Sequence, residues 1–140
     1  MAIKGLTLSS VERYISDEDP AKAAEGQEGA TVFILGPIDV FITGSVLDKV
    51  LIQSNEGIPR QVMLNRLYLE TVRFGLRGWE NFQDSAGHEI KYETNKVWVA
   101  NKEYTVVSDE CLVQMPLAVM RDLSQRIQRL NTVTEAEAKN

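Results

Sequence analysis

The 140-residue chain has few of the side chains that usually carry chemistry. It contains one cysteine, Cys111, and one histidine, His88, so it can form no internal disulfide and no zinc site from a cysteine and histidine cluster. It also lacks a phosphate-binding loop, because no Lys-Ser or Lys-Thr pair follows its glycines. These absences favour a binding protein over an enzyme, and we expect no cofactor.

The sequence also lacks a basic excess and a long apolar run. It has 15 Lys and Arg against 20 Asp and Glu, a formal net charge of −5, which argues against a general nucleic-acid binder. The longest apolar stretch, 31–42, is interrupted by Pro37 and Asp39, and the first ten residues lack the apolar core of a signal peptide. We therefore expect a cytosolic protein that binds neither nucleic acid nor a membrane.

Length and composition predict a single domain. Apolar residues make up 44% and charged residues 25% of the chain, as is typical of a globular protein. The patterns described below predict an α+β fold: a compact single domain with three main helices, a small antiparallel β-hairpin or sheet and a flexible N-terminal arm. We predict the arm over residues 1–29, the globular domain over 30–131 and a polar C-terminal tail over 132–140.

The arm is predicted from its composition. Residues 16–29 carry five acidic side chains against one lysine, with one proline, two glycines and no large apolar residue. Such a segment buries too little surface to offset the entropy lost on ordering. Just before it, residues 9–16 are expected to form one or two helical turns.

The first half of the domain is predicted to hold a strand and a helix. A β-branched and aromatic run predicts a strand over 30–35. Pro37 is suited to the first position of a helix, which we expect to run to Ser54. One face of that helix is expected to carry Ile38, Phe41, Ile42, Val46, Lys49 and Val50.

The second half begins with the most regular helical pattern in the middle of the chain, over 60–79. Residues 81–89 have the composition of a reverse turn. Alternating apolar positions then predict an antiparallel hairpin that turns near 100–103.

The last predicted helix begins at Ser108, which is suited to an N-cap. Pro116 either kinks this helix or begins a second one. Beyond it, apolar residues recur at spacings of three and four and form a seam. The seam consists of Met120, Leu123, Ile127 and Leu130.

Two helices are predicted to supply the partner-binding surface. One is the C-terminal helix, through its seam Met120, Leu123, Ile127 and Leu130. The other is the arginine-bearing helix, through Arg66, Arg73 and Arg77. Burial in the domain's own core is an equally good interpretation of each residue, and the seam could also pair two copies of the chain.

The remaining candidates have structural interpretations that we favour. His88 lies in a turn, where a solvated role is expected, and Cys111 is expected to fill the core. The acidic run 17–19 lacks the spacing of a calcium loop. Trp79 and Trp98 are both expected in the core.

The segment 72–93 carries an aromatic-Gly-Leu-x-Gly-Trp-x-Asn-aromatic pattern followed by Asp-x-x-Gly. The matching residues are Phe74, Gly75, Leu76, Gly78, Trp79, Asn81, Phe82, Asp84 and Gly87. In this pattern the chain resembles the tail assembly chaperones encoded in the tail modules of long-tailed bacteriophages. The resemblance spans roughly residues 30–140, because a strand-and-helix segment precedes the motif and a Leu-x-x-hydrophobic-Pro pattern follows it.

The resemblance implies a helper for tail building. Such proteins are thought to coat the long helical tape measure protein, to keep it soluble and to bring major tail tube protein subunits to it. A small acidic domain with an apolar groove would suit a client helix with an apolar stripe. The resemblance thus implies work in the host cytoplasm and absence from the mature virion.

The family also suggests a reason for the ending Ala138-Lys139-Asn140. Many such genes make a longer product by programmed ribosomal frameshifting, and GCA-AAA-AAC would encode these residues on a slippery sequence. The codons are the test, because GCC-AAG-AAT would remove the hypothesis.

Three other functions stay open at this point. The chain could be a structural virion component, such as a head–tail connector or a tail-tube-associated protein. It could be a small enzyme that uses His88 or Cys111, or a regulator of host machinery, for which the sequence offers no specific mark.

Overall fold

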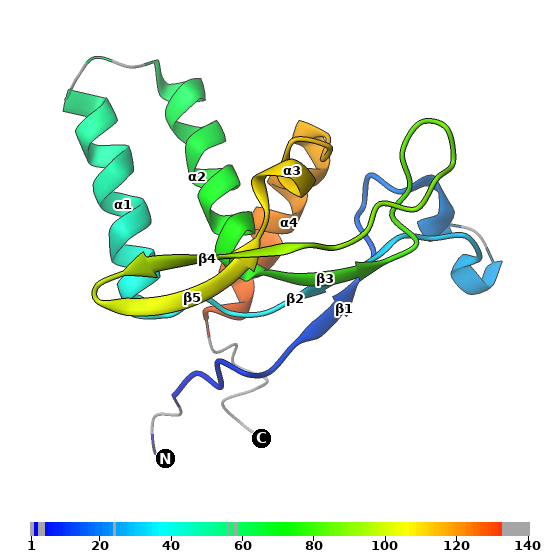
Figure 1. The fold of residues 1–140 in the computed structure, drawn as a ribbon, viewed down its shortest axis with the longest axis horizontal. Helices are drawn as coiled ribbons and strands as arrows, with labels where there is room; N and C mark the ends of the chain where they lie inside the picture. The colour runs from blue at the N-terminus through cyan, green and yellow to red at the C-terminus, as the bar shows by residue number, and fades with distance from the viewer. Residues whose placement is uncertain (1, 3–4, 24, 56, 58, 133–140) are drawn as a thin grey trace.

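The computed structural model describes residues 2, 5–23, 25–57 apart from 56, and 59–132, without the side chains of Glu25 and residues 50–55. The fold is α+β, as predicted: two small antiparallel sheets carry α-helices on one side (Figure 1). The hypothesis about residues 138–140 and most of the predicted tail lie outside the described residues.

The first sheet has three antiparallel strands in the order β1-β2-β3. They are β1 (Glu12–Tyr14), β2 (Val32–Leu35) and β3 (Leu76–Glu80). Strand β2 confirms the strand predicted over 30–35, and its alternating burial places Phe33 and Leu35 in the core. The helical turns expected over 9–16 are wrong, because this segment pairs with β2 as an edge strand.

The segment expected to be a loose arm is held by polar contacts. The Asp122 carboxylate, on α4, accepts hydrogen bonds from Ser16 Oγ at 2.7 Å, Tyr14 Oη at 3.0 Å and the Asp17 amide at 3.0 Å. The Asp19 carboxylate accepts from the Thr31 amide at 2.8 Å. Two 3₁₀ turns, η1 (Pro20–Ala23) and η2 (Glu25–Gln27), follow. These contacts are hydrogen bonds and not apolar burial, so the composition of the segment does not reveal them.

Helix α1 (Val40–Asn55) begins three residues later than predicted. Its cap is Asp39, whose Oδ1 accepts from the Ile42 amide at 2.9 Å, so Pro37 is not the first helical residue. Pro37 instead lies in the extended connection from β2. Ile42 and Val46 are buried as expected, whereas Phe41 is exposed and its assignment to the inner face is wrong.

Helix α2 (Arg60–Gly75) passes directly into strand β3. The predicted helix over 60–79 was therefore four residues too long. The change occurs where Gly75 packs against α4: a Cβ at this position would lie 2.6 Å from Ile127 Cδ1. The Gly75 carbonyl also accepts from the Gly36 amide at 2.9 Å, which links the end of α2 to the end of β2.

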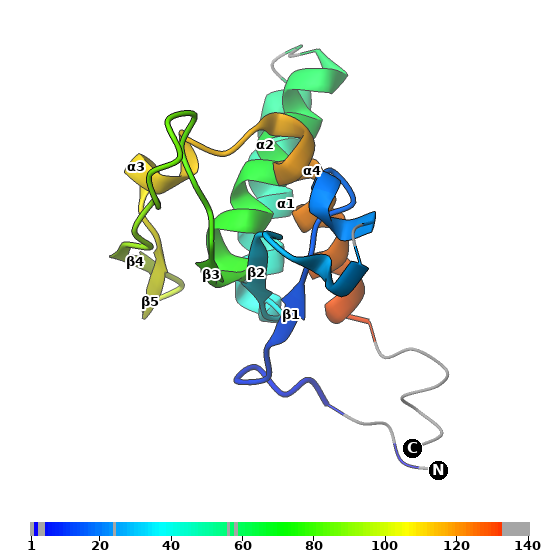
Figure 2. The same cartoon turned by 90° about the vertical axis from the view of Figure 1, so that its right-hand side faces the viewer.

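The predicted hairpin is formed by β4 (Thr94–Val99) and β5 (Lys102–Val107). Its two turn residues, Ala100 and Asn101, have φ values of 51° and 63°, the left-handed conformation that a two-residue hairpin turn requires. Figure 2 shows the hairpin beside β3, and β5 contacts β3. The hairpin therefore extends the sheet side of the molecule beyond the three-stranded sheet.

The C-terminal region forms two helices, α3 (Asp109–Leu112) and α4 (Leu117–Leu130). Ser108 caps α3 as predicted, since its Oγ accepts from the Cys111 amide at 3.2 Å. Pro116 is the N-cap of α4, which confirms the alternative of a second helix. Helix α4 packs against α2, and Asn131 after it brackets Ile38: its Oδ1 accepts from the Ile38 amide and its Nδ2 donates to the Ile38 carbonyl.

Candidate protein-interaction surface

The predicted seam of α4 lies mainly in the core. Met120 is 7% exposed, and Leu123 and Ile127 are 0% exposed. These three residues therefore hold the domain together and present no surface to a partner, in line with the alternative that the sequence left open. Leu130 is part-exposed and lines an open groove of about 360 Å³ together with Leu6 and Val11.

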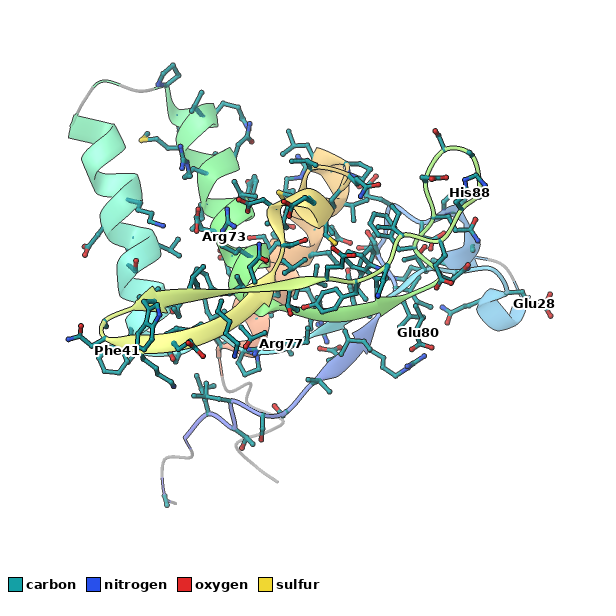
Figure 3. The ribbon with its side chains drawn as sticks, in the orientation of Figure 1. Glu28, Phe41, Arg73, Arg77, Glu80 and His88 are labelled. Atoms are coloured by element: carbon teal, nitrogen blue, oxygen red, sulfur yellow. The ribbon has the colours of Figure 1, made fainter. Side chains whose placement is uncertain are left out.

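The three predicted arginines do not share a face. Arg66 is exposed on α2, whereas Arg73 pairs with Glu70 at 3.4 Å and with Asp109 on α3. Arg77 lies on β3 and donates from Nη2 to the Pro37 carbonyl at 2.6 Å. The three arginines therefore do not lie together on one helix, because α2 ends at Gly75 and Arg77 lies on β3 (Figure 3).

The aromatic residues of the family motif form a cluster at the sheet. Trp79 meets Phe82 and Tyr92 edge to face, at ring-centroid distances of 5.0 Å each. Phe82 also packs against Phe33 of β2. Trp79 Nε1 donates to the Ile90 carbonyl at 2.7 Å, so both the ring and its polar edge are satisfied. This part of the motif builds the core.

The motif residues that flank the cluster set the backbone. Phe74 packs edge to face on Tyr104, Leu76 is buried, and Gly75 allows the contact with Ile127 described above. Gly78, in the middle of β3, is buried opposite Ile34. These positions explain the Gly-Leu-x-Gly spacing as a helix-to-strand junction.

The end of the motif forms the predicted turn. Asn81 has φ of 59° and donates from Nδ2 to the Gly29 carbonyl at 2.9 Å. Asp84 Oδ1 accepts from the amides of Ala86 and His88, both at 2.9 Å, and Gly87 has φ of 84°. The motif as a whole is thus explained by folding, and the residues available to a partner must be sought elsewhere.

An exposed apolar stripe follows the outer side of α1. Val40, Phe41 and Leu47 are 75%, 60% and 52% exposed. They lie at helical spacing around Gly44, where an added Cβ would meet no atom within 4 Å. We call Val40, Phe41, Gly44 and Leu47 the α1 surface. Figure 3 shows Phe41 at the corner of the molecule where the hairpin tip reaches α1, and α1 contacts β4.

The same corner carries an exposed tryptophan. Trp98 of β4 is 69% exposed, so the prediction that it belongs to the core is wrong, whereas Trp79 packs against the core as expected. Val97 and Val99, its neighbours along the strand, are partly buried, because successive residues of a strand face opposite sides. The alternating sequence of β4 indicated that Trp98 and its two valine neighbours face opposite sides of the hairpin. It did not show which of the two sides the rest of the chain covers.

Polar groups converge between the start of α1 and β5. Tyr104 Oη donates to Asp39 Oδ2 at 2.6 Å, and Lys102 Nζ lies 3.8 Å from the same oxygen. Burial acts to raise the pKa of Asp39, but the bonds from Tyr104 and from backbone amides, with the charge of Lys102, bring that pKa below its usual value. Burial and the bond to Asp39 raise the pKa of Tyr104 to about 12.

Within the described residues, the contacts of His88 and Cys111 are those of a turn and of the core. His88 is exposed on its turn, with Nδ1 3.7 Å from Asp84 Oδ2. Cys111 is buried and its Sγ donates to the Lys91 carbonyl at 3.3 Å, which fits the predicted core role. In the acidic run 17–19, Asp17 forms an ion pair with Lys22 and Asp19 accepts hydrogen bonds from backbone amides. The described residues contain no cluster suited to a metal ion.

Comparison with known proteins found no matching family model, no similar curated protein and no similar solved structure. Within the described part of the chain, no helix is both long and apolar enough to cross a membrane.

Proposed function

We propose that this protein is a tail assembly chaperone of a long-tailed bacteriophage. In this proposal it binds the tape measure protein, keeps it soluble and helps to recruit subunits of the major tail tube protein. It works in the host cytoplasm and is left out of the mature virion. The support comes from the resemblance over residues 74–87 and from the exposed apolar residues of α1.

The observation that carries the proposal is that the first half of α1 has apolar side chains on both its inner and its outer side. Ile42 and Val46 face the core, while Val40, Phe41 and Leu47 face solvent. The helix has only two charged side chains, Asp48 and Lys49, over its 16 residues. Exposed apolar side chains grouped on one side of a helix are suited to contact a partner, and the exposed Asp48 adjoins them on α1.

The shape of the α1 surface suits another helix. Gly44 leaves a notch between Phe41 and Leu47, because it has no side chain and nothing else fills the space. A side chain from a partner helix could enter this notch in the way that ridges of one helix fill grooves of another. A stripe of this size gives modest affinity, as a chaperone needs if tube subunits are to displace it.

The net charge of −5 supports the same function. Many acidic copies bound along one client would repel each other and the copies on other clients. The coated client would therefore stay dispersed until assembly begins.

The test is co-expression of the protein with a candidate tape measure protein. We expect the wild type to raise the soluble fraction of the client and to co-purify with it. The double substitution Phe41→Asp and Leu47→Asp should abolish both effects. Val113→Asp is the matched control, because Val113 is exposed and apolar but lies at the end of α3. Equal insolubility of the client with and without the wild type would refute the proposal.

A second readout separates a chaperone from a structural virion component. Mass spectrometry of purified particles should find the tube and tape measure proteins and little or none of this chain. Stoichiometric recovery of this chain in particles would favour a connector or a tube-associated protein instead.

A further inference from the structure

A small pocket of about 140 Å³ lies next to the α1 surface, between the connection that precedes α1 and strand β5. Its charged lining residues are Asp39, Arg77 and Lys102. Its apolar lining includes Leu8 and Phe74, from the N-terminal segment and from α2. The pocket is therefore large enough for one side chain and combines charge with apolar walls.

The carboxylate of Asp39 is already occupied by internal bonds. Its Oδ1 accepts from the Ile42 amide at 2.9 Å, and its Oδ2 accepts from Tyr104 Oη at 2.6 Å. These bonds fix the carboxylate as the cap of α1. Asp39 is consequently a part of the pocket wall and is not a group waiting for a cationic ligand.

Among its described lining residues, the pocket offers its two cations one carboxylate, that of Asp39. Lys102 Nζ forms an ion pair with Asp39 Oδ2 at 3.8 Å, which is too long for a hydrogen bond, and it also lies over the Tyr104 ring. Arg77 Nη2 donates to a neutral acceptor, the Pro37 carbonyl. Burial lowers the pKa of Arg77, as expected for a guanidinium that has lost part of its hydration.

The pocket thus has a surplus of one positive charge in a chain of net charge −5: Arg77 and Lys102 face Asp39, and Tyr104 is neutral. We infer that it binds a carboxylate side chain, an Asp or Glu, on the polypeptide that occupies the α1 surface. For the identity of that polypeptide the inference rests on the proposed function. The preferred client segment is then an apolar stripe with an acidic residue at its edge.

The surroundings would strengthen such a contact. A carboxylate that entered beside Lys102 would replace the water on its ammonium group, and Leu8 and Phe74 would keep further water away. Exposed ion pairs are weak because water screens them, so the apolar walls decide whether this pair contributes.

The first experiment uses a minimal probe on the full chain. N-acetylglutamate methylamide carries the carboxylate and no other charge, and N-acetylglutamine methylamide is its uncharged match. Titrated into ¹⁵N-labelled protein, the glutamate probe should shift the amides around Asp39, Arg77 and Lys102 with a dissociation constant of roughly 1–10 mM. The glutamine probe should produce no saturable shift. Equal shifts with both probes would overturn the inference.

The second experiment compares two lysines of one hairpin. Lys102→Gln should weaken glutamate binding by about fivefold or more. Lys96→Gln removes the same charge from the hairpin, and Lys96 pairs with Glu103 outside the pocket, so binding should not change. A spectrum that stays dispersed shows that each variant is folded. Equal weakening by both variants would show a general charge effect and would overturn the inference.

The client assay separates this inference from the proposed function. If the tape measure protein binds the wild type and Lys102→Gln equally well, the pocket plays no part and the inference fails while the function stands. If the glutamate probe binds at Lys102 but no client complex forms, the pocket is supported and the proposed client fails.

Discussion

Helices α1 and α4 both carry apolar residues at helical spacing, yet they use them in opposite ways. On α4 the apolar residues form one stripe, which α2 covers, and the other side of the helix is polar. On α1 apolar residues occur on both sides, and only the inner side is covered. The regular seam thus belongs to folding, whereas the apolar residues outside any seam are available for a partner.

A binding surface in such a chain is expected away from the regular apolar stripe. A clear amphipathic stripe is what the domain's own core requires, so it is a poor predictor of a docking site. Apolar residues that a helix does not need for its own packing are more informative, because leaving them in water has no benefit for folding.

The largest contrast is between two leucines. Leu123→Ala on α4 should lower the free energy of unfolding by about 2–5 kcal/mol, because Leu123 is fully buried. Leu47→Ala on α1 should change it by no more than about 0.5 kcal/mol. Urea unfolding followed by circular dichroism measures both. Similar losses would mean that the outer side of α1 is covered after all.

Alanine substitutions at two glycines should change the free energy of unfolding in opposite directions. Gly75→Ala places a methyl group against Ile127 and should destabilise the fold by about 1–3 kcal/mol. Gly44→Ala meets open space and should stabilise α1 by roughly 0.5–1 kcal/mol, because alanine favours a helix over glycine. Urea unfolding measures both changes. If both substitutions changed the free energy of unfolding in the same direction, the close packing at Gly75 or the open space at Gly44 would be contradicted.

The cap of α1 should make its stability depend on pH. Asp39→Ala should cost about 1 kcal/mol at neutral pH through loss of the N-cap. The pKa of Asp39 is lowered in the folded state, so its contribution is present above the ordinary value of about 4 and is lost as the pH falls through the folded value. The difference in unfolding free energy between wild type and Asp39→Ala should therefore become smaller below about pH 4. If this free-energy difference stayed constant down to the pH of acid denaturation, the charged Asp39 carboxylate would not be the stabilising cap of α1.

The smallest effect on stability is expected at the α1 surface itself. Phe41→Ser should change the free energy of unfolding by no more than about 0.5 kcal/mol, since Phe41 is mostly exposed. The same substitution should reduce the fluorescence of an apolar dye such as ANS when the folded protein is added. Val113→Ser is the control, because Val113 is exposed but lies at the end of α3 and outside the α1 surface, so this substitution should leave the dye signal unchanged.

Sequence patterns predicted the elements that depend on neighbouring residues. Strand β2, the hairpin β4–β5 and the cap at Ser108 follow from local alternation, turn chemistry and capping. Other features depend on residues far along the chain. Helix α2 ends where Gly75 meets Ile127, and the N-terminal segment is ordered by Asp122, more than 100 residues away. No local pattern contains such contacts.

The candidate site was less predictable than the fold. The seam of α4 was recognisable, but periodicity alone cannot say whether a stripe meets the core or a partner. Phe41 was placed on the inner face of its helix because of its spacing, and Trp98 was placed in the core because of its size. The exposure of both is set by which face of α1 and of the hairpin the rest of the chain covers. The pocket was invisible because Asp39, Arg77 and Lys102 come from three separate segments.

The bracket that Asn131 forms around Ile38 has a mechanical consequence. The side-chain amide of Asn131, the residue that follows α4, binds the backbone of Ile38, two residues before α1 starts. The two hydrogen bonds measure 2.9 Å and 3.0 Å. Fraying at the end of α4 would break this link to the start of α1, so we expect the amide hydrogens of the two ends to exchange in a coupled way. A force applied to the chain after residue 131 would accordingly be transmitted to the start of α1, which lies far away in the sequence.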